Sequence, residues 1–258
     1  MKTHAIWMII VLLLGSAGVI AQDANPYEVS GNKNQVDENG LKTGFWEERN
    51  GELSTLGNYI NGLKDGTWET YLSNNILFRV ETYQKGQRNG LTLQFDRRGK
   101  ITNVEHYKNN KPDGLMLIYS PHSAIVVKEQ HYDNGKLTGL YRTFYNTGKI
   151  QEEAFYKEDQ KHGPARWYSP EGKLVASYFY QNGLFEGSNK TYYDNDTIAT
   201  VTFFKNNEMN GEYKEYYRNG KPKIVGNYLN GNKEGIWIEY DETGVPVEKT
   251  KYKNGVAK

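Results

Sequence analysis

Histidines are the first residues to weigh for chemistry, because imidazole binds metal ions and moves protons near pH 7. The sequence has five of them. His106 and His131 each stand one residue before a tyrosine, which gives them equivalent places in the chain. A zinc site needs three or four ligands close together, and no third type of ligand recurs beside this pair. We therefore expect surface histidines, with no metal centre and no other cofactor.

The acidic residues give no clearer sign of catalysis. Glu47-Glu48, Glu152-Glu153 and Asp241-Glu242 are not isolated in apolar stretches of the kind that raise a carboxyl pKa for acid–base work. The acidic segment Asp194-Asn195-Asp196 lacks the spaced ligands of a calcium loop. No Ser-His-Asp arrangement or nucleophile elbow is recognisable. The sequence predicts a protein that is not an enzyme, and only a dispersed site would escape this interpretation.

A glycine-rich stretch, YLNGNKEGIWIEY at residues 228–240, raises the separate question of a phosphate-binding loop. Such a loop requires a Gly-Lys-Ser/Thr ending followed by a helix. The place of Gly235 is instead filled by glycine nine times, at spacings of 22 to 25 residues and with no shared ending of that kind. These key glycines are Gly44, Gly66, Gly90, Gly114, Gly139, Gly163, Gly187, Gly211 and Gly235. The stretch is one copy of an internal repeat.

Other positions keep the same register. Four residues before each key glycine stands a Gly, Asn or Asp, and Asn-Gly recurs there, as at Asn61-Gly62 and Asn230-Gly231. Asn-Gly between β-prone runs is a strong hairpin signal, and these residue types tolerate a positive φ. A second turn follows nine residues after most key glycines, as at Gly172 and Gly220. Each unit is therefore predicted to contain two strands and two turns.

The key glycine never becomes Asn or Asp. Because a positive φ alone would allow those residues, we expect that a neighbouring aromatic ring lies on the backbone and excludes a Cβ. Along the strand after the second turn, Leu174, Ala176, Tyr178 and Tyr180 fall on one face, and Ile198, Thr200, Thr202 and Phe204 match them in the next unit. This alternation predicts a sheet with two different faces.

The expected fold is all-β: an elongated array of about nine hairpin repeats of ~24 residues, forming a twisted antiparallel sheet or solenoid over residues 35–258. Nine units give about eighteen strands. Equivalent residues of successive units then lie two strand spacings, ~9.6 Å, apart. Lys249, Lys251 and Lys253 would stand on the last strand, where lysines discourage pairing with another sheet. Ordinary solvated lysines are an equal alternative.

The pattern Asn61-Gly62, Gly66, Trp68, Tyr71, repeated at Asn230-Gly231, Gly235, Trp237, Tyr240, resembles the MORN-repeat variant family, which includes YwqK-type antitoxin-like proteins. The resemblance covers residues 35–255. It implies a hairpin array without enzymatic activity. The antitoxin label belongs to cytoplasmic relatives, and the N-terminus of this chain points elsewhere.

That N-terminus, residues 1–21, carries Lys2, a long apolar run and small residues at Val19-Ile20-Ala21. These features predict a secretory signal peptide that is cleaved before Gln22, with an uncleaved anchor as the alternative. Residues 22–34 would form a linker. Export to the periplasm or the medium follows, and after cleavage we expect no membrane contact.

The rest of the composition limits the classes of partner and site that the chain can have. There is no cysteine, which excludes disulfides and thiolate metal sites. Cleavage removes Lys2 alone among the charged residues, so that 31 basic and 31 acidic residues remain. A neutral chain offers no basic stripe for nucleic acid. Tyrosine, with 21 copies, points to an ordered chain with an aromatic interior.

One aromatic column carries the binding hypothesis. It consists of Trp46, Trp68, Tyr141, Tyr213 and Trp237, each two residues after a key glycine. If the column is exposed, it forms a ladder for glycan rings or for an apolar patch of a partner protein; if it is buried, it is core. A sheet this poor in aliphatic residues must bury something, which favours core. The sequence thus predicts a non-enzymatic, exported module that binds another protein in the cell envelope, with binding of carbohydrate or peptidoglycan as the alternative.

Overall fold

The computed structural model of the protein describes residues 32–258, of which Asn34–Lys258 form one unit. The predicted signal peptide, residues 1–21, and most of the predicted linker, residues 22–34, lie outside the described residues. Every regular element of the described part is a β-strand. Residues 32–258 hold no helix of the length and apolar character needed to cross a membrane.

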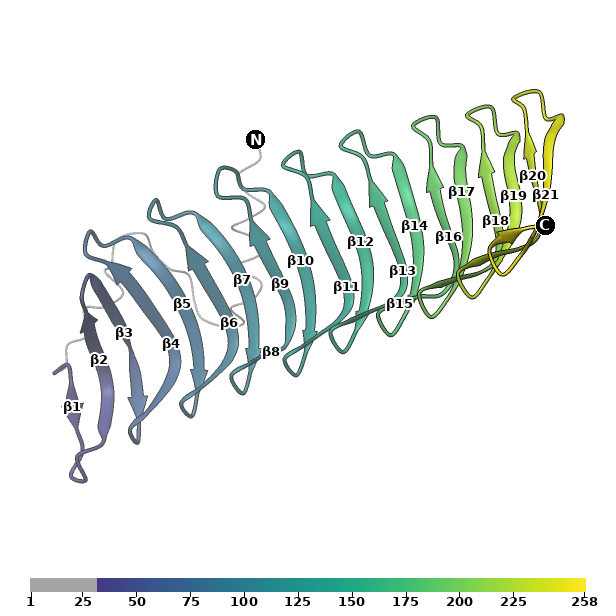
Figure 1. Cartoon of the computed structure of the whole chain (residues 1–258). Helices are drawn as coiled ribbons and strands as arrows, with labels where there is room; N and C mark the ends of the chain where they lie inside the picture. Colours follow the sequence, from purple (N-terminus) through teal and green to yellow (C-terminus); the bar gives the residue numbers. More distant parts are fainter. Residues whose placement is uncertain (1–31) are drawn as a thin grey trace. The chain divides into compact units, whose positions relative to one another are not determined.

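The strands lie side by side in chain order, and each main strand pairs antiparallel with the next (Figure 1). The first half of the array contains β1 (Gln35–Val36), β2 (Lys42–Asn50), β3 (Leu53–Ile60), β4 (Leu63–Leu72), β5 (Leu77–Gln84), β6 (Gln87–Phe95), β7 (Ile101–Lys108), β8 (Lys111–Pro112), β9 (Gly114–Tyr119), β10 (Val126–Asp133) and β11 (Lys136–Phe144). The second half contains β12 (Ile150–Lys157), β13 (Gln160–Tyr168), β14 (Leu174–Gln181), β15 (Leu184–Phe185), β16 (Gly187–Tyr192), β17 (Ile198–Lys205), β18 (Glu208–Tyr216), β19 (Pro222–Leu229), β20 (Asn232–Tyr240), β21 (Pro246–Lys253) and β22 (Val256–Ala257).

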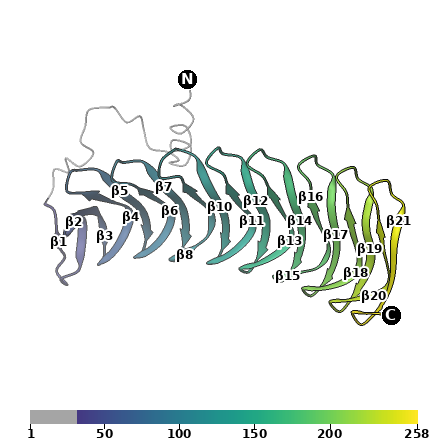
Figure 2. The same cartoon turned by 45° about the horizontal axis from the view of Figure 1, so that its top comes forward.

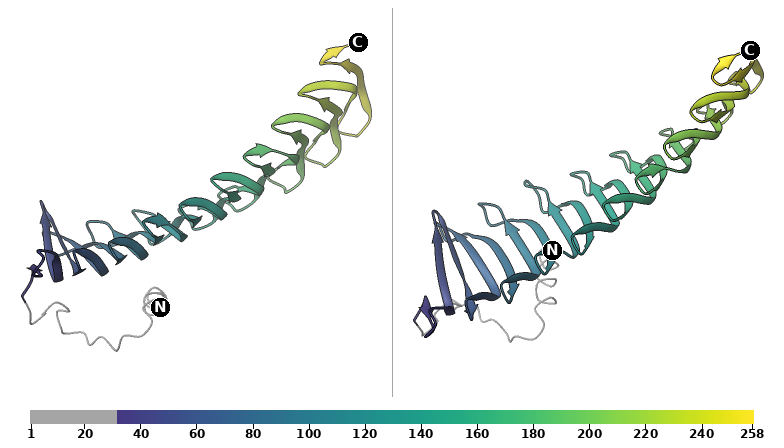
Figure 3. Two further views of the ribbon diagram at one scale, coloured as in Figure 1. Left: turned by 90° about the horizontal axis from the view of Figure 1, so that it is seen from below. Right: turned by 60° about the horizontal axis from the view of Figure 1, so that its bottom comes forward.

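The 22 strands reduce to nine hairpins. Strand β8 continues into β9 and β15 into β16 after a one-residue break, while β1 and β22 are short pieces at the two ends. The remaining pattern is the predicted array of about eighteen strands, so the all-β hairpin fold is confirmed. The sheet of residues 34–258 curves and twists along its length, as Figure 2 and Figure 3 show.

Two-residue turns join each hairpin to the next. In the turn between β3 and β4, Asn61 has φ 50° and Gly62 has φ 77°, the pair of positive values that a type I′ turn requires. Nine such turns occur in the described residues, which confirms the expected positive φ at the Gly, Asn or Asp position. In two of these turns the first residue is a lysine or a glutamate, Lys85 and Glu158, and the backbone of each also has φ 49°.

Most key glycines lie at bulges. Leu56 pairs with Glu69 and Asn58 with Asp65, so that Gly57 alone stands opposite the three residues 66–68 of β4. The same shift recurs at Gly90, Gly139, Gly163, Gly211 and Gly235, whereas at Gly114 and Gly187 the strand is interrupted by a one-residue break. All nine key glycines have positive φ, between 69° and 119°. A bulge bends the strand and increases its twist, and repetition of the bulge gives the sheet its curvature.

The expected reason for the key glycine was wrong. A Cβ on Gly66 or Gly235 would meet no atom within 4 Å, so no aromatic ring lies on them. Positive φ is the common cause, because side chains rarely adopt it. At Gly211 a Cβ would also stand 3.0 Å from the Cβ of Phe203.

The core is a row of aromatic rings on one face of the sheet, which we call the inner face, in contrast to the opposite, outer face. Trp68 lies edge-on between Tyr59 and Tyr83, with ring centroids 5.0 and 6.4 Å away. Near the other end, Trp237 lies in the same way between Tyr228 and Tyr252. Edge-to-face contacts of this kind add to the free energy gained by burying the rings. The interior predicted from composition is therefore aromatic, with tyrosines beside the tryptophans, although Tyr59, at 8% exposed, is the one buried tyrosine of residues 32–258.

Small residues make room for the large rings. Gly226 pairs with Tyr213, and the Trp237 ring lies against its backbone: a Cβ there would stand 2.2 Å from Cδ2 of the ring. Gly57 has the same relation to Trp68. In the middle of the array the equivalent residue is Ala154, which is fully buried. The ring-over-glycine packing expected at the key glycines thus occurs at these two other glycines.

We predict that Gly226→Ala lowers the free energy of unfolding by about 1–3 kcal/mol, because the added methyl overlaps the Trp237 ring. Urea unfolding followed by circular dichroism measures this. The double variant Gly226→Ala with Trp237→Ala recreates the alanine-lined surroundings of Ala154. Its loss of stability should be smaller than the sum of the two single losses. Additive losses would show that the ring does not lie on Gly226.

Candidate functional site

The histidines considered above as metal ligands do not form a site. His106 Nδ1 lies 2.8 Å from the carbonyl oxygen of Leu115, and His131 Nε2 lies 3.2 Å from a carboxylate oxygen of Glu129. In residues 32–258 no group of three or more His, Asp and Glu side chains is arranged to hold a metal ion. Each histidine instead contacts its own sheet neighbours.

The acidic segment Asp194-Asn195-Asp196 forms the turn between β16 and β17. The carboxylate of Asp194 accepts a hydrogen bond of 2.7 Å from Arg218, which lowers the pKa of this exposed carboxyl. Asp196 takes φ 66° in the turn. These contacts give the segment a structural role between neighbouring repeats.

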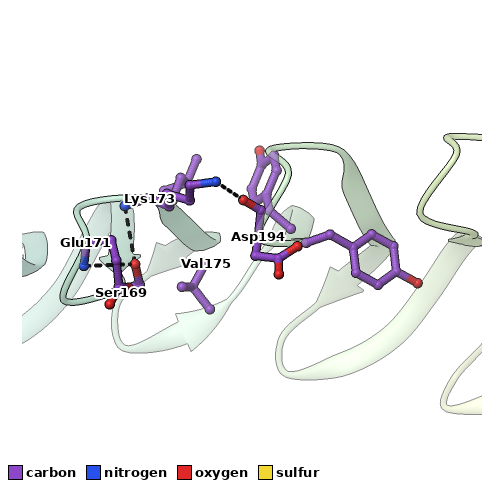
Figure 4. A pocket seen from close by; sticks show the side chains of 8 residues that line it. Ser169, Glu171, Lys173, Val175 and Asp194 are labelled. Carbon is purple, nitrogen blue, oxygen red and sulfur yellow. Dashed lines mark hydrogen bonds between the residues drawn. The ribbon is translucent and has the colours of Figure 1, made fainter.

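A shallow hollow of about 410 Å³ lies between this turn and the preceding one (Figure 4). Ser169, Glu171, Lys173, Val175 and Asp194 are among the residues that line it. The ammonium of Lys173 donates to the backbone carbonyl of Asp194 across the hollow.

The same link recurs elsewhere. Lys149 donates to the carbonyl of Glu171 and Lys221 to that of Thr243. The lysine that follows a second-turn glycine therefore ties neighbouring repeats together. The hollow is the gap that these ties bridge.

The predicted aromatic column lies on the inner face. Trp68 and Trp237 are 1% and 4% exposed, whereas Trp46, Tyr141 and Tyr213 are half-buried. Indole Nε1 of Trp68 donates to the carbonyl of Asn58, and that of Trp46 donates to the carbonyls of Gln35 and Thr43. Nε1 of Trp237 is buried and meets no partner among the described residues.

Lysines cover the tryptophan rings. The ammonium nitrogens of Lys42, Lys64 and Lys233 lie 4.4, 3.8 and 4.2 Å from the ring centroids of Trp46, Trp68 and Trp237, respectively. Contacts at these distances are cation–π interactions. With tyrosine edges on their sides and a lysine above, these rings offer little free face to a ligand.

Burial also affects the tyrosines of this face. Burial, with Glu152 nearby, raises the pKa of Tyr156 and Tyr180 to about 12, and burial with Glu215 nearby does the same for Tyr213. The folded chain therefore holds these phenol protons more tightly than the unfolded chain, whose tyrosines titrate near pH 10. It follows that these groups contribute stability below pH 10, which is lost as the pH rises toward 12.

We predict that phenolate absorbance between pH 8 and 12 rises in two steps while the chain is folded, and in one step near pH 10 in urea. Tyr213→Phe should reduce the later step. Circular dichroism at each pH reports whether the chain is still folded. A single step near pH 10 in the folded protein would contradict the burial of these rings.

The outer face carries a different aromatic column. Phe155, Phe179 and Phe203 are 39%, 43% and 36% exposed. Each stands one residue before a closing aromatic, on β12, β14 and β17, and at intervals of 24 residues. The closing aromatics point inward, so alternation along the strand turns the phenylalanines outward. We call these three residues the Phe stripe.

The strands on either side leave the Phe stripe uncovered. On the preceding strands, Leu140 pairs with Phe155, Pro164 with Phe179 and Ser188 with Phe203. On the strand that follows Phe155, a bulge with its key glycine lies opposite: a Cβ added to Gly163 would stand 3.7 Å from the Cβ of Phe155. Phe179 and Phe203 therefore lie beside smaller side chains, whereas Phe155 has the larger Leu140 as its cross-strand neighbour.

A charged row runs next to the Phe stripe on the same face. The guanidinium of Arg142 lies 2.7 Å from Glu153, and Arg166 approaches the same carboxylate at 3.5 Å. Ser177 follows on β14 and pairs with Lys190 on β16. No ion pair involves Lys190 within the described part of the chain.

Residues 137–158, 161–182, 209–230 and 233–254 match the family profile described as the MORN repeat variant. These four segments of the chain are similar to MORN-variant repeats. The resemblance drawn from the sequence is confirmed there, and Phe155 and Phe179 lie within two of the matched segments.

The other comparisons add little. No curated protein matches the chain significantly. Among 49 solved chains with some similarity is one from the crystal structure of TcdB2-TccC3, 12% identical over 80% of this chain and 16% of that one, with a TM-score of 0.17. Nothing about function follows from a likeness this slight. The antitoxin-like association stays a prediction.

Sequence reasoning noticed the position of the Phe stripe only through His106 and His131, which fill it in two earlier repeats of the chain. The available signal was two adjacent aromatic residues, such as Phe179-Tyr180, in three successive repeats. Strand alternation cannot bury both members of such a pair on one face.

Two sequences match glycosylation acceptors. Asn189, in Asn189-Lys190-Thr191, is buried, and its Oδ1 accepts a hydrogen bond of 2.9 Å from the backbone N–H of Phe179. Asn195, in Asn195-Asp196-Thr197, is exposed and donates to the carbonyl of Arg218. The first acceptor is part of the fold and is closed to modification.

Proposed function

We propose that this chain is a non-enzymatic repeat module, exported to the cell envelope, that holds another protein on the outer face of its sheet. The observation that carries the proposal is the Phe stripe. Three large apolar side chains of a regular array remain exposed, although the opposite face of the same strands is well packed. Contiguous exposed apolar groups mark interaction sites on soluble proteins.

MORN-variant repeats support the coarser part of this proposal, since such arrays present long surfaces built from neighbouring units. The absence of enzymatic activity is part of the proposal, and it agrees with the finding that no group of His, Asp and Glu in residues 32–258 is arranged to hold a catalytic metal ion. The glycan alternative relied on Trp46, Trp68, Tyr141, Tyr213 and Trp237. It gains no support from rings that are buried or covered by lysine.

Export is proposed from the sequence of residues 1–21 alone. We predict that mass spectrometry of the chain recovered from its source cells, through a C-terminal tag, finds Gln22 as the first residue, in the periplasmic or secreted fraction. An intact N-terminus in the membrane fraction would support the anchor alternative. An intact N-terminus in the cytoplasm would contradict export.

Binding to a protein is testable in cells with a photo-crosslinking amino acid, p-benzoylphenylalanine. We predict that this residue in place of Phe179 forms a covalent adduct with a discrete partner. The matched control carries it in place of Asn227, which occupies the equivalent position outside the Phe stripe.

An adduct at position 179 that is absent at position 227 supports the proposal. Equal labelling at both positions, or no adduct at positions 155, 179 and 203, would contradict it. Mass spectrometry of the adduct identifies the partner.

A further inference from the structure

The Phe stripe has a spacing that limits what can bind along it. Phe155, Phe179 and Phe203 occupy equivalent places on every second strand. Strands of a sheet lie ~4.8 Å apart, so neighbouring rings stand ~9.6 Å apart and the three span ~19 Å. A ligand that contacts all three must present an apolar group at about this interval.

The backbone beneath the rings is already paired. Strands β12, β13, β14, β16 and β17, which include the three that carry the phenylalanines, each have a partner on both sides. A ligand therefore cannot join as an additional strand at this position, because joining requires a free edge. It must lie across the strands and be recognised through side chains.

The regular conformations of a peptide differ in their fit to this interval. A polyproline II helix has three residues per turn and a rise of 3.1 Å, which repeats one side every ~9.3 Å. A β-strand repeats one side every ~6.8 Å and an α-helix every ~5.4 Å. Polyproline II also leaves its backbone groups in water, so it can lie on an apolar face without losing internal hydrogen bonds.

The charges beside the Phe stripe indicate which charge a ligand in the polyproline II conformation should carry. Arg142 and Arg166 both approach the carboxylate of Glu153, and Arg142 also lies 3.8 Å from Glu129, so that two carboxylates face these two guanidinium groups. Lys190 has Ser177 and Val201 as its cross-strand neighbours, and it makes no ion pair within residues 32–258. Cations thus outnumber carboxylates next to Phe179 and Phe203, which suits an acidic ligand.

We infer that the Phe stripe binds an acidic, proline-rich segment of the partner protein in the polyproline II conformation. Its prolines stack on the three phenylalanine rings, one per turn, and its carboxylates face Arg166 and Lys190. Aromatic rings that receive successive turns of such a helix are a general mode of recognition. The inference rests on the proposed protein-binding function and names the chemistry of the partner.

The test uses the chain 22–258 and a fluorescent peptide of Pro-Pro-Glu repeats, at least as long as the about seven residues that span ~19 Å. Fluorescence anisotropy measures binding. Two peptides serve as controls: Gly-Gly-Glu repeats keep the charge without the helix, and Pro-Pro-Lys repeats keep the helix with the opposite charge. We expect binding of Pro-Pro-Glu only.

The decisive variant is Phe179→Asn. The same position holds Asn58 and Asn227 in other repeats, so the fold accepts asparagine there. Loss of a central aromatic anchor should weaken binding by about tenfold or more, with circular dichroism and the urea midpoint unchanged. Lys190→Glu should weaken binding as well, whereas Val247→Asn, an exposed apolar residue outside the Phe stripe, should leave it unchanged.

No binding of Pro-Pro-Glu, equal binding of Gly-Gly-Glu, or full binding by Phe179→Asn would overturn the inference. So would a dimer in analytical ultracentrifugation that Phe179→Asn converts to a monomer, because a second copy would then occupy the Phe stripe. The photo-adduct at position 179 separates the two proposals. An adduct without peptide binding leaves the protein-binding function standing and removes only the ligand proposed here.

Discussion

The structure depends on one backbone constraint, the positive φ of a glycine placed once in each repeat. At six of these nine positions the strand pairing shows a bulge, and at Gly114 and Gly187 the strand is interrupted instead. Recurrence of the bulge along the array bends the sheet repeatedly. On the inner face, the Trp68 ring lies 5.0 and 6.4 Å from the rings of neighbouring tyrosines, and contacts of this kind replace an aliphatic core.

The two faces of the sheet differ in the side chains that they accept. Inward residues must fit a limited space, and large rings therefore stand beside Gly57, Gly226 or Ala154. Outward residues are free of this requirement, since the same position holds Asn, Thr, His, Phe or Lys in different repeats. Where packing leaves a position free, three successive phenylalanines need another explanation, and binding to a partner supplies one.

Much of the fold could be predicted because the repeats can be compared with one another within the one sequence. Asn-Gly turns, key glycines and closing tyrosines recur in them in one register. The reason for the key glycine could not, because sequence does not distinguish a glycine that needs positive φ from one that lies under a ring. For the aromatic column of Trp46, Trp68, Tyr141, Tyr213 and Trp237, the poverty in aliphatic residues favoured the core, but the alternation along the strand could not assign the column to a face. A bulge between Gly66 and Trp68 changes the alternation on which such an assignment depends.

Hydroxyl-radical footprinting of the chain 22–258, read by mass spectrometry residue by residue, tests this separation of faces most directly. Trp68 and Trp237 are intrinsically reactive but buried, while Phe155, Phe179 and Phe203 are exposed. The structure predicts strong protection of the two tryptophans relative to the unfolded chain and little protection of the three phenylalanines. Modified tryptophans together with protected phenylalanines would show that the column of Trp68 and Trp237 is the exposed surface. That result would contradict the assignment of the two faces.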